Sequence, residues 1–382
     1  MTRDLAHYPL SELVIERPKS TIRVRDSSEI GPVPFYTSGI KIARHIESLC
    51  SGENIFIATG GKANFQYLDG PAAYSTDTYV ITGTNRIETK FLYYFLTSQT
   101  EFIDENLFRG AALRHLSRPE FKALQVPLPS LLEQQRIVRL LDEAIERITV
   151  AKANAEKNIR NSRVLFESRL QAEIQNCFDN AETTKLENLC APDAPIIYGI
   201  LQPGPHQPSG IPFVRPTEIQ DGVIEAGSLH RTSPEIAKRY KRSTLATGDI
   251  ILSIVGTIGK VAVVEEWLQG GNITQSSARI RADKAKINPD FLRYLLLSSQ
   301  LRNQYESVRM GTAVTRLNIA HVRALQVPVL PLHRQQEVVE KMSGVALICQ
   351  NLSEVMSRKS NLIDVLEATL LQACFSNTEV FS

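Results

Sequence analysis

The chain has 382 residues, of which 43% are hydrophobic and 22% charged, and its formal net charge is +2. This is the composition of an ordinary folded soluble protein, and no apolar run approaches the ~18–20 residues of a membrane span. The first residues lack the pattern of a signal peptide, and the five cysteines form neither a CxxC pair nor a metal-binding spacing, so we expect a cytoplasmic protein.

Residues 1–129 are expected to form an α+β domain. Short apolar runs at residues 54–58 and 79–82 are bounded by Gly, Pro, Ser and Asp, which is typical of strands. Residues 91–108 have the pattern of an amphipathic helix. A loop follows that helix at residues 109–119.

Residues 130–180 are expected to form one long helix. They contain neither Gly nor Pro, and apolar or small residues recur at steps of three and four. Ser130 followed by Glu133 is a capping-box pattern at its start. At about 1.5 Å per residue, such a helix is too long for a globular core, so its narrow stripe needs a partner helix.

Residues 184–330 are expected to form a second α+β domain, in which the apolar run at 250–255 predicts a strand. This part of the chain is also locally basic. Residues 200–330 hold 16 Lys and Arg against 10 Asp and Glu, whereas residues 1–130 hold 14 of each kind. A basic domain suits a polyanion, although such a bias is common in proteins that bind nothing anionic.

Residues 331–376 are expected to form the second long helix, which supplies the partner that the stripe of the first helix needs. Antiparallel packing of two such equivalent helices would place the two copies about a pseudo-two-fold axis, a symmetry that the DNA backbone shares. The apolar stripe of this helix is expected at Val338, Met342, Val345, Cys349, Leu352, Met356, Lys359, Ile363, Leu366, Leu370 and Ala373.

The second domain and helix repeat the text of the first. ALQVP at residues 123–127 returns at residues 324–328, and the other matched pairs have offsets of 176 to 201 residues, which leaves about 25 extra residues in the second copy. The chain is therefore a tandem duplication in which the framework repeats and the inserts differ. The matched pairs include two repeated glutamine pairs, which are candidates for contact with a partner protein: Gln134, Gln135, Gln335 and Gln336.

Polar and basic residues on equivalent loops of the two copies are candidates for contact with DNA. Arg, Asn and Lys read guanine and adenine edges, and Thr and Lys can hold phosphate. Any one of them alone is better explained as a solvated side chain, so the argument depends on the set. The candidates are Lys62, Asn64, Arg109, Arg114 and Arg118 in the first copy and Lys260, Arg279, Arg309, Thr312, Thr315, Arg316 and Asn318 in the second.

Catalytic motifs are missing from the sequence. Gly61-Lys62 and Gly259-Lys260 lack the earlier glycine and the following Ser or Thr of a phosphate-binding P-loop. No GxSxG elbow, no HxxxH pair and no NPPY-like methyltransferase tetrapeptide occurs. We therefore expect a non-catalytic chain with no metal or cofactor of its own.

The order of domain, ALQVPLPSLLEQQRIVRLLDEAIERI and long helix, followed by the same order again, resembles the specificity subunit of a type I restriction–modification system. In the second domain, GDIILSIVGTIGK followed by NITQSS is also similar to that family's framework. Two departures stand out. The second helix is preceded by VPVLPLHRQQE, with Arg334 where Glu133 stands in the first copy, and the first domain has GGK where the second has GTIGK.

The resemblance implies two target recognition domains, each reading one half of a split DNA target, and an antiparallel coiled coil of the two long helices that spaces them and binds partners. Because the inserts of the copies differ, we expect an asymmetric target. The implied partners are two adenine-methyltransferase subunits with S-adenosylmethionine and a restriction subunit with ATP and Mg²⁺. The alternative hypothesis is a duplicated coiled-coil adaptor that assembles proteins without reading DNA.

Overall fold

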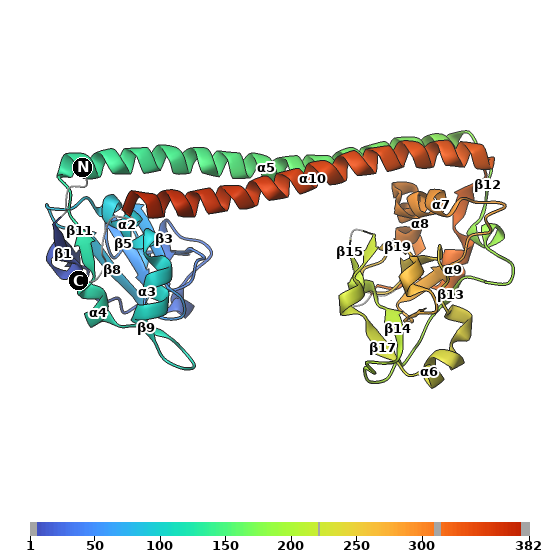
Figure 1. Ribbon diagram of the computed structural model, residues 1–382, viewed down its shortest axis with the longest axis horizontal. Coiled ribbons are helices and arrows are strands. Elements are labelled where there is room, and N and C mark those ends of the chain that lie inside the picture. The colour runs from blue at the N-terminus through green and yellow to red at the C-terminus, as the bar shows by residue number, and fades with distance from the viewer. Residues whose placement is uncertain (1–5, 221, 309–314, 376–382) are drawn as a thin grey trace. The chain divides into compact units, whose positions relative to one another are not determined.

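The computed structural model describes residues 6–220, 222–308 and 315–375. The chain divides into two compact units. Unit 1 contains the residues up to Lys157 and from Met356 onwards, and unit 2 contains Asn158–Val355. Both divisions fall inside long helices, so each unit holds one mixed α and β domain and a segment of each long helix (Figure 1).

Unit 1 is built on a four-stranded antiparallel sheet. Its order is β2 (Val14–Glu16), β8 (Thr78–Gly83), β5 (Glu53–Ala58) and β6 (Phe65–Asp69). Strand β5 is apolar almost throughout because both of its faces are covered. Ile55 and Ile57 pack in a core with helix α2 (Thr89–Ser98), whereas Phe56 packs on the opposite face.

A smaller sheet contributes to the core on the Phe56 face. Its order is β4 (Ala43–His45), β3 (Val33–Tyr36) and β7 (Ala73–Tyr74), with β3 and β7 parallel. Tyr36 stacks on Phe56 with ring centroids 3.9 Å apart. The other elements of unit 1 are β1 (His7–Pro9), α1 (Leu10–Leu13), a 3-10 turn (Val24–Asp26), α3 (Thr100–Leu107), β9 (Phe108–Arg109), β10 (His115–Leu116), α4 (Arg118–Lys122) and β11 (Gln125–Pro127).

Unit 2 repeats this plan element by element. Its four-stranded sheet has the order β13 (Ile197–Tyr198), β21 (Ser277–Ile280), β18 (Ile250–Ser253) and β19 (Val261–Val263). Its smaller sheet has the order β17 (His230–Thr232), β14 (Ile211–Val214) and β20 (Asn272–Ile273), again with one parallel pair. The other elements that match unit 1 are β12 (Thr183–Lys185), α7 (Pro289–Leu297), α8 (Ser299–Val308), α9 (Ile319–Ala324) and β22 (Gln326–Pro328). This correspondence confirms the predicted duplication.

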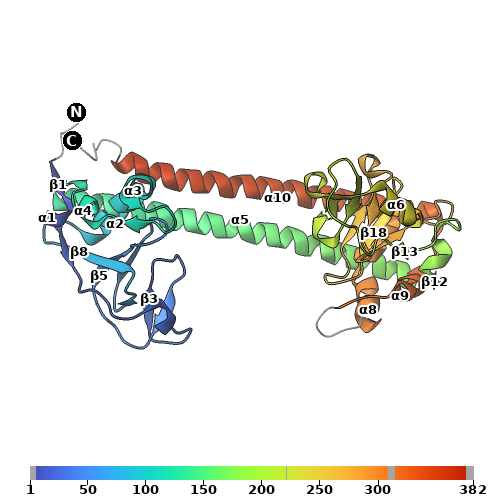
Figure 2. The same cartoon turned by 90° about the horizontal axis from the view of Figure 1, so that it is seen from below.

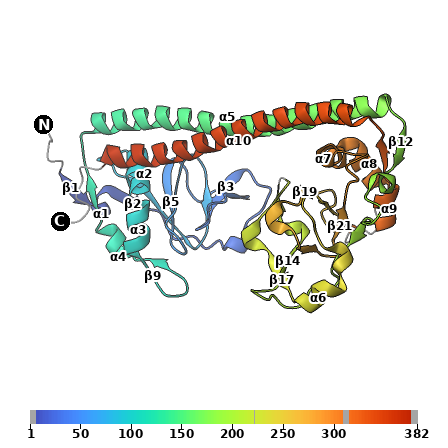
Figure 3. The same cartoon turned by 45° about the vertical axis from the view of Figure 1, so that its right-hand side comes forward.

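The extra residues of unit 2 lie mainly in two connections of the smaller sheet. Residues 215–229 join β14 to β17 and form the hairpin β15 (Ile219–Gln220) and β16 (Val223–Ile224). Helix α6 (Pro234–Arg239) lies in the next connection (Figure 3). The 3-10 turns of unit 2 are Leu186–Leu189, Pro216–Glu218, Ala226–Ser228, Lys241–Ser243 and Glu266–Leu268.

The two long helices are α5 (Leu131–Asp179) and α10 (Leu332–Phe375). Within each unit, the segments of the two helices lie side by side and run in opposite directions (Figures 1 and 2). In unit 1 the Lys152 ammonium lies 2.6 Å from the Asp364 carboxylate. In unit 2 the hydroxyls of Ser162 and Ser353 are 3.0 Å apart.

A seven-residue period describes the buried face of this helix pair. The buried residues that fit it are Leu141, Ile148, Ala155 and Ser162 on α5 and Met342, Cys349 and Ile363 on α10. Arg169, which continues the period on α5, is exposed. The sequence placed Leu352 and Leu366 on the same stripe, but they are 37% and 56% exposed. Among the described helices, none has both the length and the apolar composition to cross a membrane.

Candidate nucleic-acid interface

Two loops of unit 1 meet at one end of the large sheet. They are the turn between β5 and β6 and the loop between β9 and β10. The N–H of Gly61 donates to the carbonyl of Arg114 at 2.9 Å, and the N–H of Leu116 donates to Thr59 at 3.0 Å. Gly61 has a φ of +86°, a conformation that favours glycine. We call residues 59–64 and 110–116 edge 1.

The same arrangement recurs in unit 2. The N–H of Gly256 donates to the carbonyl of Thr315 at 2.9 Å, and the N–H of Leu317 donates to Ile254 at 2.7 Å. We call the described residues 254–260 and 315–318 edge 2. Loops that lie more than fifty residues apart in the sequence therefore meet through matching backbone hydrogen bonds in both units.

Asp104 on α3 holds the two loops of edge 1 together. Its carboxylate accepts the N–H of Ala63 at 2.6 Å and the guanidinium of Arg114 at 2.9 Å. The Ala63 N–H, together with Arg114, holds the pKa of the Asp104 carboxyl below its usual value. Asp104 was not among the residues that the sequence singled out, because a lone carboxylate on an amphipathic helix carries no motif.

The remaining basic candidates of unit 1 differ in how freely they face solvent. Lys62 is exposed on edge 1. Arg109 is also exposed, with its guanidinium 3.3 Å from the Glu120 carboxylate. The guanidinium of Arg118 lies over the ring of Tyr79, 4.7 Å from its centroid, and this side chain is half-buried. Lys62 is therefore the most accessible cation of edge 1 among these candidates.

The candidates of edge 2 are one exposed arginine and two side chains that organise the loop. Arg316 is exposed. The Thr315 hydroxyl donates to the carbonyl of Gly256 at 3.0 Å. The Asn318 side chain caps helix α9 by accepting the N–H of Ala320 at 3.3 Å.

Two predicted DNA contacts of unit 2 are used inside the fold. Arg279 is only 2% exposed, and its guanidinium donates to the carbonyl of Pro195 at 2.8 Å. Burial lowers the pKa of Arg279. The Lys260 ammonium donates to the carbonyls of Pro216 and Ile219, at 3.0 and 2.8 Å. We therefore remove Arg279 from the candidate contacts, because a buried side chain cannot reach a DNA groove, and assign Lys260 a supporting role.

Arg309 and Thr312, which the sequence also singled out, lie outside the described residues.

A cleft of about 540 Å³ adjoins edge 2. Thr217, Thr257 and Gln275 contribute polar side chains to its lining. Hydroxyl and amide groups of this kind can bond to base edges or phosphates.

Gln134 joins the first domain to helix α5. Its side chain is fully buried, and its amide oxygen accepts the N–H of Glu88 at 2.8 Å. Its amide nitrogen donates to the carbonyls of Arg86 and Pro129, at 3.2 and 2.8 Å. One side chain thus ties the start of the long helix to the start of α2.

Gln335 does the same in unit 2. It is 2% exposed, and its amide oxygen accepts the N–H of Asn288 at 2.7 Å. Its amide nitrogen donates to Lys286 and Leu330, at 3.0 and 2.8 Å. The buried glutamines are not accessible to a partner protein in this structure.

The neighbouring glutamines are exposed. The amide of Gln135 donates to the Glu88 carboxylate at 2.8 Å, and that of Gln336 accepts from the Asn288 side chain at 3.0 Å. The prediction of partner contact therefore stays with Gln135 and Gln336.

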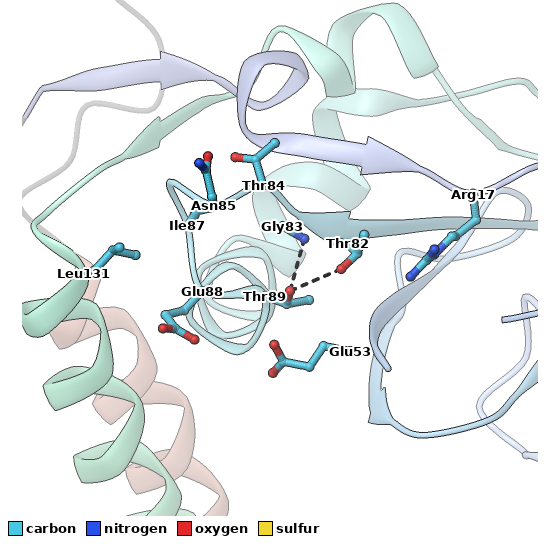
Figure 4. A pocket seen from close by; sticks show the side chains of 10 residues that line it. All are labelled: Arg17, Glu53, Thr82, Gly83, Thr84, Asn85, Ile87, Glu88, Thr89 and Leu131. Atoms are coloured by element: carbon cyan, nitrogen blue, oxygen red, sulfur yellow. Dashed lines mark hydrogen bonds between the residues drawn. The ribbon is translucent and has the colours of Figure 1, made fainter. Parts of the chain in front are cut away.

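A polar cleft of about 310 Å³ lies beside this joint in unit 1 (Figure 4). Glu88 and Thr89 at the start of α2 face it, together with Leu131 at the start of α5. The hydroxyl of Thr89 accepts the N–H of Gly83 at 3.1 Å. No cluster of three or more metal-binding side chains occurs here or elsewhere in the described parts of the chain.

The sequence matches the family described as the type I restriction modification DNA specificity domain, over residues 10–160 and again over 205–354. The chain belongs to this family. The two matched regions coincide with the two copies of the repeat, so each unit carries one specificity domain with part of a long helix.

Relatives in this family are distant in sequence. The specificity subunit of the type I restriction enzyme EcoBI from Escherichia coli is 26% identical over 76% of this chain and 66% of its own length, just under two thirds. The MjaVIII specificity subunit of Methanocaldococcus jannaschii is 20% identical over 80% of this chain and 74% of its own length.

Solved structures share the fold. A chain from a type I R-M system, solved in work on complex assembly and conformational transition, has a TM-score of 0.72 at 17% identity, with 97% of this chain and 98% of that chain covered. The HsdS subunit from Thermoanaerobacter tengcongensis has a TM-score of 0.55 at 17% identity, with coverages of 97% and 96%. The predicted α+β fold with two duplicated domains and two long helices is confirmed.

Proposed function

We propose that this chain is the DNA-specificity subunit of a type I restriction–modification complex, and that each unit reads one half of a split, asymmetric DNA target. One observation carries the proposal. A chain of the DNA specificity family builds the same two-loop edge twice and furnishes the two edges with different side chains. A protein that reads two unlike half-sites needs this combination of a repeated frame and unlike contacts.

The exposed side chains of the two edges suit this role. Edge 1 offers Lys62, and edge 2 offers Arg316 on a loop that Thr315 fastens. Arg and Lys bind guanine edges and phosphates, so these side chains can either read or anchor the duplex. In this proposal residues 1–129 and 184–330 are the recognition domains, and residues 130–180 and 331–376 are the spacers.

Exposed aliphatic side chains on α10 suit the docking of partner proteins. Leu362 and Val365 in unit 1 are 69% and 62% exposed, and Ile348 and Val355 in unit 2 are 63% and 56% exposed. Apolar side chains at helical spacing are what a partner helix would cover. Since each unit has such a surface, two adenine-methyltransferase subunits would bind one chain.

In this proposal the chain is not catalytic and carries no cofactor. Its methyltransferase partners would supply S-adenosylmethionine, and a restriction subunit that joins them would use ATP and Mg²⁺. The complex would act in the cytoplasm on cellular DNA.

The alternative is an adaptor that assembles proteins but does not bind DNA. The test is a gel-shift titration of the chain, purified with its methyltransferase, on duplex DNA at several salt concentrations. A specificity subunit gives a shift whose log K falls linearly with log salt, because phosphate contacts release counterions. An adaptor gives no shift. Native mass spectrometry of the same sample should give two methyltransferases per chain.

A further inference from the structure

The connection between β3 and β4 in unit 1 is fastened to the hairpin that forms edge 1. We call this connection, residues 37–42, tip 1. The side-chain amides of Asn64 and Gln66 both donate to the carbonyl of Gly39, at 3.3 and 3.1 Å. The N–H of Gly39 donates to the Thr37 hydroxyl at 3.1 Å. These contacts fix the backbone of tip 1 beside the β5–β6 turn.

Tip 1 presents a large aliphatic side chain to solvent. Ile40 is 85% exposed, and Ile42 beside it is 47% exposed. A single exposed hydrophobic residue is ordinary on a protein surface. Ile40 differs from such a residue in two ways. The backbone of tip 1 is held by hydrogen bonds, and the exposed cations Lys41 and Lys62 lie on the same two connected hairpins.

The matching connection of unit 2, residues 215–229, is held from the same place. There the Lys260 ammonium, at the β18–β19 turn, donates to the carbonyls of Pro216 and Ile219. The two connections occupy the same place in the fold, and each is held by side chains from the turn of the neighbouring hairpin. Their structures differ, because unit 2 has the β15–β16 hairpin where unit 1 has a short turn. Two domains that share a fold but read unlike DNA sequences must differ where they contact the DNA. These two connections are where the two domains differ most.

We propose that tip 1 enters a groove of the DNA at the half-site read by unit 1, and that Ile40 makes an apolar contact with a base pair there. Ile40 is then a specificity-determining residue, and Lys41 and Lys62 lie over flanking phosphates. The proposal rests on the proposed function. DNA offers an aliphatic side chain two apolar surfaces: a thymine methyl group in the major groove, or a base step opened by a wedge.

The test compares Ile40→Ala with Ile46→Ala in the full chain bound to its methyltransferase. Ile46 is a matched control because it is 74% exposed and follows β4 at the end away from tip 1. The probes are duplexes that carry the methylated motif and its single base-pair substitutions. Ile40→Ala should reduce discrimination about fivefold or more at one or two adjacent base pairs of one half-site.

Ile40→Ala should leave discrimination at the other half-site unchanged. It should also leave the slope of log K against log salt unchanged, because no charge is lost. Ile46→Ala should behave as the unchanged protein. Replacing thymine by uracil at the affected position separates the two apolar surfaces. If the methyl group is the contact, uracil weakens binding by the unchanged protein to the level of the variant; if a base step is opened, uracil has no effect.

Equal binding of Ile40→Ala and the unchanged protein to every substituted duplex would overturn the inference. So would a uniform loss on all duplexes, because that is the behaviour of a residue that reads no base. If the unchanged protein itself shows no sequence preference, the proposed function fails instead. Thermal unfolding of both variants checks that they fold.

Discussion

The backbone N–H of Glu88 donates to the buried side-chain oxygen of Gln134 at 2.8 Å. The same bond recurs in unit 2, where Asn288 donates to Gln335 at 2.7 Å. In each case the amide nitrogen also reaches two backbone carbonyls. Because the amide uses both of its polar atoms on backbone groups of the domain and of the helix start, it fixes how each domain meets its helix.

Gln134→Glu should destabilise unit 1. The new carboxylate has no N–H for the carbonyls of Arg86 and Pro129, so two half-buried acceptors lose their donor and face an acidic group. We expect a loss of about 1–3 kcal/mol in the free energy of unfolding. Denaturant unfolding measures it, with Gln135→Glu as the exposed control. Equal losses in the two variants would show that the buried amide does not hold the joint.

Asp104→Asn should loosen edge 1 in a pH-dependent way. The folded-state pKa of Asp104 is lowered, chiefly by the Ala63 N–H, so its stabilising effect is present above the ordinary value of 3.8 and is lost as the pH falls through the folded-state pKa. Hydrogen exchange of the Ala63 amide should therefore be faster in the variant near neutral pH. The difference should shrink below about pH 4.

The control for Asp104→Asn is Glu105→Gln, an exposed neighbour on the same helix. A difference between Asp104→Asn and the unchanged protein that persists undiminished into strong acid would mean that charge is not what fastens the loop.

Arg316→Ala should weaken DNA binding through one half-site only. Its exposed guanidinium is the side chain of edge 2 best suited to a guanine edge, and losing such a contact costs about 1–3 kcal/mol. Binding to duplexes altered in one half-site at a time measures the effect. Lys284→Ala, an exposed cation of unit 2 outside edge 2, is the control. If Arg316→Ala binds every duplex with unchanged affinity, Arg316 is a solvated surface side chain that does not contact DNA.

The length of the helix pair should set the gap between the half-sites. Four residues inserted after Ser162 and four after Leu352 lengthen both helices at the level where Ser162 meets Ser353. Each insertion adds about 6 Å and about 40° of net rotation, close to the ~34–36° of one base pair. The variant should prefer a gap one base pair longer.

Seven residues at the same two points supply the contrast. They preserve the seven-residue period of the buried face but add about 10 Å, or about three base pairs, with almost no net rotation. The half-sites would then be about 100° out of phase, and binding should be lost. Retention of the original gap by the four-residue variant would contradict the role of the helices as spacer.

The fold class could be predicted because it follows from hydrophobic periodicity and from the repeated text. Both can be read from the sequence without knowing which distant residues touch. The sequence placed Leu352 and Leu366 in the helix interface, but the seven-residue period buries a narrower face than steps of three and four suggest. The repeat marked Gln134 without revealing its use, because its partner Glu88 lies 46 residues away.

The site residues were harder to predict, because residue type does not reveal burial. Arg279 is of the right type for DNA but is enclosed beside the Pro195 carbonyl. Asp104 became visible only when the fold brought it to Ala63, 41 residues earlier. Tip 1 carries no motif at all, and its position beside edge 1 depends on the side-chain amides of Asn64 in the β5–β6 turn and Gln66 in strand β6.

The most direct measurement is to map methylated adenines across the genome of a host that expresses this chain with its methyltransferase. The host with the methyltransferase alone is the reference. We expect one motif of two unlike half-sites with an unspecified gap of fixed length, present only when this chain is present. A palindromic motif would contradict the assignment of unlike half-sites to the two units. A motif that is unchanged without this chain would contradict its role in reading DNA.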